Sequence, residues 1–265
     1  SFREFVELHR PRGVSSAETR ELFEHYLVLG GFPLLKYFDL DSQASVQYLD
    51  SLLDTVVVRD VLEHFAIRDV DMFRRILRYC VGNVGRTFSA QSVSRYLKSE
   101  GRAVSVDTVL NYLQHCAEPY LVDKVPRFDV VGKQPLRADE KYYVVDQGLR
   151  TALGFDNRAD IELVLENIVY QELRSRGCTV HVGWCGSREV DFIAQRGTVT
   201  RYIQVSYLLA DEATVEREFG VLESIPDNHP KTVVSMDPVS RSRNGIEHVN
   251  IVDFLMDDPL AEWNG

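Results

Sequence analysis

Glu189 and Asp191, two acidic residues separated by one position, are the sharpest chemical signal in the sequence. Side chains alternate along a β-strand, so both carboxylates are expected on one face, with Val190 and Phe192 on the opposite, core-facing side. Carboxylate oxygens are the ligands that a hard divalent cation such as Mg²⁺ prefers. A cation held there could clamp a phosphate and lower the pKa of an attacking water, which is the chemistry of phosphodiester hydrolysis.

A second polar pair, Gln204 and Ser206, follows on the next expected strand. Gly197 lies between the two strands, where a hairpin needs a turn. If the strands pair, the two acids face an amide and a hydroxyl across the sheet. Glu166, on the preceding expected helix, could approach the same place.

This layout resembles that of PD-(D/E)XK nucleases at Glu166, Asp191, Gln204 and Ser206. The resemblance implies Mg²⁺ as the cofactor of an active site, with Glu166, Glu189 and Asp191 as its metal ligands. The sequence departs from the pattern twice, because Gln204 replaces the second acid and Ser206 replaces the lysine that would steady the developing charge. We therefore interpret Glu166, Asp191, Gln204 and Ser206 as vestigial catalytic residues, with no cofactor in this chain.

The lysine of the nuclease pattern has no near substitute in the sequence. No lysine occurs between residues 142 and 230, so a migrated lysine would be Lys231 or lie farther away. Arg188 or Arg201 could stand in, with less flexible placement. The alternative is that the polar residues of these two strands form an ordinary hydrophilic sheet face.

The last segment, residues 151–265, alternates between helical and strand patterns. This predicts a mixed sheet with helices packed against it, and the resemblance to PD-(D/E)XK nucleases implies a restriction-endonuclease-like domain. Helices are expected at 161–177 and 214–225, and strands or strand-like runs at 178–183, 189–194, 201–207, 231–236 and 249–254.

The middle segment, residues 71–150, has the order helix–helix–helix–strand–strand, which is the arrangement of a winged helix. Its third expected helix, 105–118, contains no Lys or Arg, although such a helix usually reads the major groove. Residues 86–147 hold nine basic residues against eight acidic ones, a weak excess for binding phosphates. The candidate DNA-binding residues are therefore the basic residues of the wing, Lys124, Arg127, Lys133 and Arg137. The alternatives are that the wing is a solvated loop or that the segment is a protein-binding module.

The first segment, residues 1–70, shows helical periodicity and no strand pattern. Helices are expected from Ser16 to about residue 29 and through the apolar stripe that ends near Phe65. Gly30-Gly31-Phe32-Pro33 breaks the chain between them. The overall expectation is an α+β chain made of a helical lid, a winged helix and a nuclease-like domain.

Several phrases together resemble the predicted AAA-superfamily ATPases of bacteria and archaea that end in a domain of unknown function. The resemblance implies a nucleotide-binding module ahead of this chain, ATP bound there, and oligomers formed through that parent protein. No G-x-x-x-x-G-K-[ST] occurs here, so no ATP-binding residue is assigned. The phrases are Ser1-Phe-Arg-Glu-Phe5, Gly30-Gly31-Phe32-Pro33, Val57-Val-Arg-Asp60, Lys141-Tyr-Tyr-Val-Val-Asp146-Gln-Gly148, Leu165-Glu-Asn167 and Tyr202-Ile-Gln-Val-Ser206.

The composition is that of an acidic globular protein. The formal net charge is −10, which disfavours a protein that coats nucleic acid through bulk electrostatics. No apolar run is long enough for a membrane helix, no signal peptide is visible, and the four cysteines form no C-x-x-C pair. We expect a cytoplasmic protein without a membrane partner, and the initial Ser suggests a fragment or a processed chain.

Three functions remain open on these grounds. The first is a non-catalytic regulatory region of an ATPase that binds DNA or protein. The second is a Mg²⁺-dependent DNA nuclease of the PD-(D/E)XK type, and the third is a module that only binds proteins.

Overall fold

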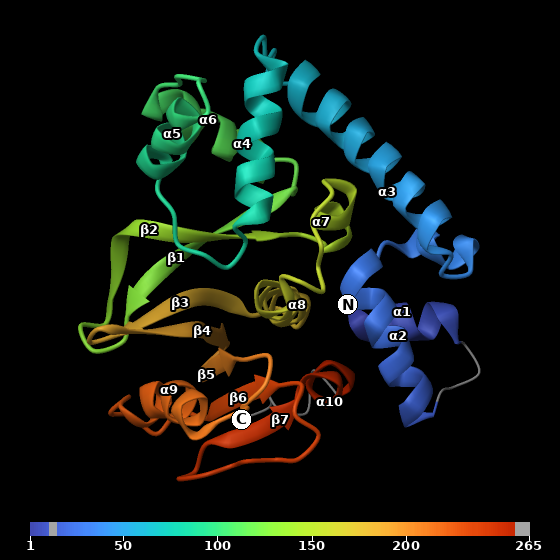
Figure 1. Ribbon diagram of the computed structural model, residues 1–265. Helices are drawn as coiled ribbons and strands as arrows, with labels where there is room; N and C mark the ends of the chain where they lie inside the picture. Colours follow the sequence, from blue (N-terminus) through green and yellow to red (C-terminus); the bar gives the residue numbers. More distant parts are fainter. Residues whose placement is uncertain (11–14, 258–265) are drawn as a thin grey trace.

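A seven-stranded mixed sheet runs through the molecule in the order β2-β1-β3-β4-β5-β6-β7 (Figure 1). The structure, a computed structural model, describes residues 1–10 and 15–257, without the side chains of residues 137–139. With its helical part and mixed sheet, it confirms the expected α+β fold. The strands are β1 Val122–Asp129, β2 Gln134–Val144, β3 Thr179–Cys185, β4 Arg188–Arg196, β5 Val199–Val205, β6 Lys231–Ser235 and β7 Glu247–Asn250.

The middle segment has the predicted order of three helices and a hairpin. The helices are α4 Val70–Gly82, α5 Ala90–Ser99 and α6 Val106–Ala117, and strands β1 and β2 follow them. The hairpin is part of the central sheet, because β1 pairs in parallel with β3 from Arg127 opposite Val182 to Asp129 opposite Trp184. The sheet therefore continues across residue 150, where the sequence suggests a domain boundary.

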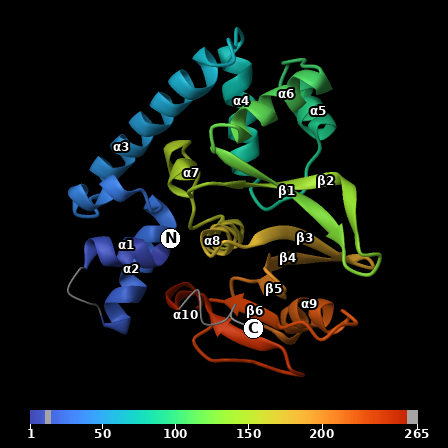
Figure 2. The ribbon, with the colours of Figure 1, turned by 180° about the vertical axis from the view of Figure 1, so that it is seen from behind.

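The first segment is helical, as expected. Its longest helix, α3 with the π-helical turn η2, runs along the outer edge of the molecule in both views (Figures 1 and 2). No helix in residues 1–10 and 15–257 is long and apolar enough to cross a membrane. The elements are α1 Phe2–His9, α2 Ser16–Leu29, η1 Pro33–Phe38, α3 Ser42–Thr55 and η2 Val56–Glu63.

Two helices, α8 (Ile161–Ser175) and α9 (Glu212–Glu223), cover opposite faces of the sheet. Leu165 and Ile168 of α8 belong to a buried apolar cluster with strand residues, while Phe219 of α9 belongs to a different one. Helices α1, α2 and α10 (Ile251–Met256) contribute to the α8 cluster. Burial of these two apolar clusters is the main force that holds the helices against the sheet.

A β-bulge in β4 corrects one prediction, namely that Val190 and Phe192 share a face. His181 of β3 pairs with Ile193 and Gly183 pairs with Val190, so three steps on β4 match two on β3. The extra residue reverses the alternation: Val190 packs in the α9 cluster and Phe192 in the α8 cluster. A strict period of two cannot show such an insertion.

The strand-like run at 249–254 is also corrected. Strand β7 ends at Asn250, and α10 begins at the next residue. The side chain of Asn250 accepts a hydrogen bond from the backbone N–H of Val252 at 2.9 Å, which satisfies a free donor of the first helical turn.

Gly30 and Gly31 lie against the segment Asp146-Gln147-Gly148. The close contact between the two segments leaves no room for larger side chains, which explains the glycines in both. The buried Asp146 carboxylate accepts hydrogen bonds from the N–H groups of Gly31 and Gly148, both at 2.7 Å. Gln147 donates to the carbonyl of Tyr26 at the end of α2. These contacts tie the end of α2 to the start of α7 (Gly148–Ala152).

Gly30→Ala should destabilise the protein strongly. Gly30 has φ +76, and an added Cβ would lie 1.7 Å from Asp146 Oδ1. We expect the free energy of unfolding to fall by about 1–3 kcal/mol more than in Gly101→Ala, measured by urea denaturation. Gly101 is the matched control, because its φ is +77 and nothing lies within 4 Å of an added Cβ. Equal losses in the two variants would contradict this packing.

The buried Asp146 should make stability depend on pH. Burial raises its pKa from 3.8 to about 6, although the Gly31 and Gly148 N–H groups oppose the shift. The folded state then binds a proton more tightly than the unfolded state, so this stabilisation is complete below pH 4 and is lost as the pH rises through 6. Between these values the wild type should lose about 1.4 kcal/mol per pH unit relative to Asp146→Asn. Urea denaturation of both proteins at about pH 4.5 and about pH 5.5, inside this window, measures the two slopes, and parallel slopes would show that the pKa of Asp146 is not raised.

Candidate functional site

The ammonium group of Lys141 lies at the centre of the acidic cluster, which we define as Glu166, Glu189 and Asp191. Lys141 Nζ is 2.8 Å from Glu166 Oε1 and 2.6 Å from Glu189 Oε1. The lysine side chain is almost fully buried, at 3% exposure. The carboxylates that the sequence marks as metal ligands therefore converge on a cation supplied by the protein itself.

Strand β2 positions this lysine by its alternation. Tyr142 and Val144 point into the apolar cluster of α4–α6, so Lys141 and Tyr143 point the other way, toward α8. The hydroxyl of Tyr143 donates to Glu166 Oε1 at 2.6 Å, the same oxygen that accepts from Lys141. One carboxylate oxygen of α8 is thus held by two residues of β2.

Asp191 and Gln204 lie where β4 and β5 begin to diverge. The ladder between these strands starts at Phe192 opposite Ile203, one step further along the sheet. Beyond it, Asp191 N–H donates to Gln204 Oε1 at 3.2 Å, and Asp191 Oδ2 accepts from Val205 N–H at 2.8 Å. The expected neighbours are therefore brought together, but the amide oxygen of Gln204 is engaged by the backbone.

Burial dominates the electrostatics of the site. It raises the pKa of Asp191 well above its ordinary value, and the charge of Glu166 adds to this, while Lys141 and the Val205 N–H oppose it. Burial alone would lower the pKa of Lys141, but the charges of Glu166, Asp191 and Glu189 outweigh it and the net shift is upward. Lys141 thus stays charged, and Asp191 is pushed toward its neutral form.

A small cavity of about 170 Å³ lies beside the cluster. Helix α8 lines one part of it and α9 another, where Glu218 Oε1 is 2.7 Å from Arg217. The buried Ser206 also lines this cavity, so all four residues interpreted as vestigial meet at one place. They are Glu166, Asp191, Gln204 and Ser206.

The residues present do not form a metal-binding set. Among the described residues, no three Asp, Glu, His or Cys side chains are grouped so that they could hold a metal ion. Glu166 and Glu189 instead share the ammonium of Lys141. These two ion pairs place a positive charge beside the carboxylates of the acidic cluster, which offsets the cost of removing them from water.

Lys141 was not predicted as a site residue, because it directly precedes the lysine-free stretch of residues 142–230. Lys231, the substitute considered, instead donates to the carbonyls of Ile225 and Asp227. The signal that could have found Lys141 is its place two residues before Tyr143 on a strand whose other face is apolar. A charged residue on such a strand needs a buried partner.

Three of the wing residues predicted to bind DNA have described side chains, and each has a different environment. Lys124 is paired with Glu140 at 2.8 Å, and the buried Arg127 lies over the Trp184 ring, 4.3 Å from its centroid. Lys133 is exposed at the hairpin turn. The side chain of Arg137 lies outside the described part of the chain.

Lys141→Met should destabilise the protein by about 3 kcal/mol, because it leaves the partly buried carboxylates of Glu166 and Glu189 without their counter-ion. Lys124→Met is the matched control on the same hairpin, with an exposed ion pair worth less than about 1 kcal/mol. Thermal or urea denaturation of both variants measures the difference, and a Lys141→Met protein as stable as Lys124→Met would refute the role of the ion pairs.

Comparison with known proteins gives a family and two relatives. A family model described as "Domain of unknown function (DUF8612)" matches residues 20–159, more than half of the chain. An uncharacterized protein of Haemophilus influenzae is 30% identical over 97% of this chain, and one of Methanocaldococcus jannaschii is 25% identical over 99%. The chain spans only 63% and 60% of these two relatives, respectively. No solved structure matches it. The matched segment contains Lys141 and Asp146, and the chain belongs to the DUF8612 family.

Proposed function

We propose that this chain is a non-catalytic regulatory region that binds DNA or protein within a longer AAA-family ATPase. The observation that carries the proposal is the buried ammonium of Lys141, which pairs with Glu166 and Glu189 where a nuclease would need a divalent cation. Gln204 supports it, because its amide oxygen accepts from the backbone of Asp191. The cluster acts as an internal ion pair that joins β2, α8 and β4.

The ATPase part of the proposal rests on two supports. Six phrases of the sequence resemble such ATPases, and more than a third of each relative lies outside the region that this chain spans. That remainder has room for a nucleotide-binding module. ATP binding and assembly into oligomers would belong to that module, in a cytoplasmic protein.

A Mg²⁺-dependent nuclease is the second candidate, and one observation favours it. Lys141, on a strand outside the usual motif, places a positive charge at the acidic cluster. It could therefore replace the lysine that the nuclease pattern has at the position of Ser206. Against it stand the absence of a metal-binding group among the described residues and the engaged amide of Gln204.

A module that binds only proteins is the third candidate. Helix α6 contains no Lys or Arg and exposes Val106 and Leu110, which lie one helical turn apart. Such a surface fits an apolar partner better than a phosphate backbone.

The wild-type protein should not cleave DNA. We expect supercoiled plasmid to remain intact with Mg²⁺ or Mn²⁺, and Asp191→Ala to give the same result as the wild type, because Glu166 and Glu189 are paired with Lys141 and the Gln204 amide oxygen accepts from the backbone. Agarose-gel analysis over a range of protein concentrations measures this. Cleavage by the wild type that disappears in both Asp191→Ala and Lys141→Met would replace the proposal with the nuclease.

A further inference from the structure

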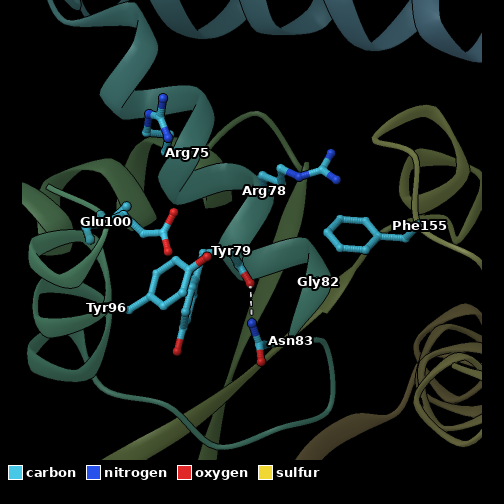
Figure 3. Close-up of a pocket in the computed structure, with 9 residues that line it drawn as sticks. Arg75, Arg78, Tyr79, Gly82, Asn83, Tyr96, Glu100 and Phe155 are labelled. Carbon is cyan, nitrogen blue, oxygen red and sulfur yellow. Dashed lines mark hydrogen bonds between the residues drawn. The ribbon is translucent and has the colours of Figure 1, made fainter. Parts of the chain in front are cut away.

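A second pocket, of about 590 Å³, opens between α4, α5 and the segment after α7, on a different part of the molecule from the acidic cluster (Figure 3). One stripe of α4 lines it, since Arg75, Arg78, Tyr79 and Gly82 are spaced by three or four residues. Helix α5 adds Tyr96 and Glu100, and Phe155 lies across the opening from them (Figure 3).

Aromatic rings form both sides of this pocket. Tyr79 and Tyr96 lie together, with ring centroids 5.0 Å apart. On the other side, Phe155 packs against α4 at Gly82, where an added Cβ would come within 2.7 Å of the ring. Phe155 is also contacted by the guanidinium groups of Arg78 and Arg150, whereas Tyr96 is 47% exposed and offers ring surface on which a flat group can stack.

Two arginines lie at the same opening. The guanidinium of Arg78 lies 4.7 Å from the Phe155 centroid and donates to the carbonyl of Leu153. Arg75 pairs with Asp71 at 2.9 Å, and Arg102 shares that carboxylate at 3.0 Å. One acid thus serves two exposed cations, which leaves positive charge for an anion.

The charge around the pocket is opposite to that of the whole chain. Residues 70–102 hold two acidic residues, Asp71 and Glu100, although the net charge of the protein is −10. The same stretch holds seven basic residues: Arg74, Arg75, Arg78, Arg86, Arg95, Lys98 and Arg102. Among the residues described, Arg86, Arg95 and Lys98 are exposed, and no acidic partner is seen for them.

We infer that this pocket binds a nucleotide unit, with the base stacked on the exposed ring of Tyr96 and the phosphate beside Arg75 and Arg78. Stacking accepts any base, and arginine pairs well with phosphate oxygens. The Glu100 carboxylate accepts hydrogen bonds, so it can pair with the N–H donors that bases carry on their Watson–Crick edge. A single strand supplies such units with unpaired bases, and its further phosphates would meet the outer cations of α5.

This inference deepens the proposed binding role and does not depend on the acidic cluster being inactive. A wild type that cleaves DNA would remove the proposed function and leave this site in place. Loss of binding in the pocket variants alone would locate the site without bearing on cleavage.

The test is fluorescence anisotropy with a labelled single-stranded oligodeoxycytidine of about 12 nucleotides at low salt. Arg75→Glu and Tyr96→Ala should each weaken binding about fivefold or more, since both side chains line the pocket. Arg74→Glu is the matched control, because Arg74 also forms an exposed ion pair on α4 but with Asp54 of α3. It should change binding less than about twofold.

Further arms separate the sources of the nucleotide unit. Displacement of the labelled strand by CMP would assign the pocket to free nucleotides as well, whereas displacement only by unlabelled oligodeoxycytidine would assign it to strands. No binding to the wild type, or equal weakening by Arg74→Glu and Arg75→Glu, would overturn the inference.

Discussion

The pairing of a buried lysine with two partly buried carboxylates is the constraint on which the central part of the molecule depends. An ion taken out of water costs several kcal/mol, and only close partners of opposite charge offset that cost. Lys141 meets this need for Glu166 and Glu189 together, and Tyr143 adds a hydrogen bond to the same oxygen of Glu166. The three partners come from β2, α8 and β4, so the arrangement exists only when all three elements are docked.

This constraint joins parts of the chain that the sequence suggests are separate. The hairpin of β1 and β2 follows the three-helix bundle in the chain, yet it pairs with β3 and sends Lys141 into the acidic cluster. Its two faces serve different units: Tyr142 packs with the helices α4–α6, and Tyr143 packs against α8. The alternation of a single strand therefore carries both contacts.

Local patterns were sufficient to predict most elements and their order. Helical periodicity located α2, α6 and α8 and predicted the order of α4, α5 and α6, and the meeting of Asp191 with Gln204 followed from the spacing of two adjacent strands. What escaped prediction depends on contacts between distant residues or on small irregularities. Lys141 is 25 residues from Glu166, and nothing local marks the pair. The bulge in β4 depends on the register in which β3 pairs with it, and the sequence of β4 alone does not determine that register.

The hydrogen bonds at the end of α2 bear on how the N-terminal helices can move. The last carbonyls of that helix accept from Gln147, Thr151 and Asn157, side chains that lie more than a hundred residues away. The C-terminal end of α2 therefore cannot separate from α7 and its flanking residues without breaking these three buried or partly buried hydrogen bonds. A hinge motion of this helix would have to be accompanied by motion of α7.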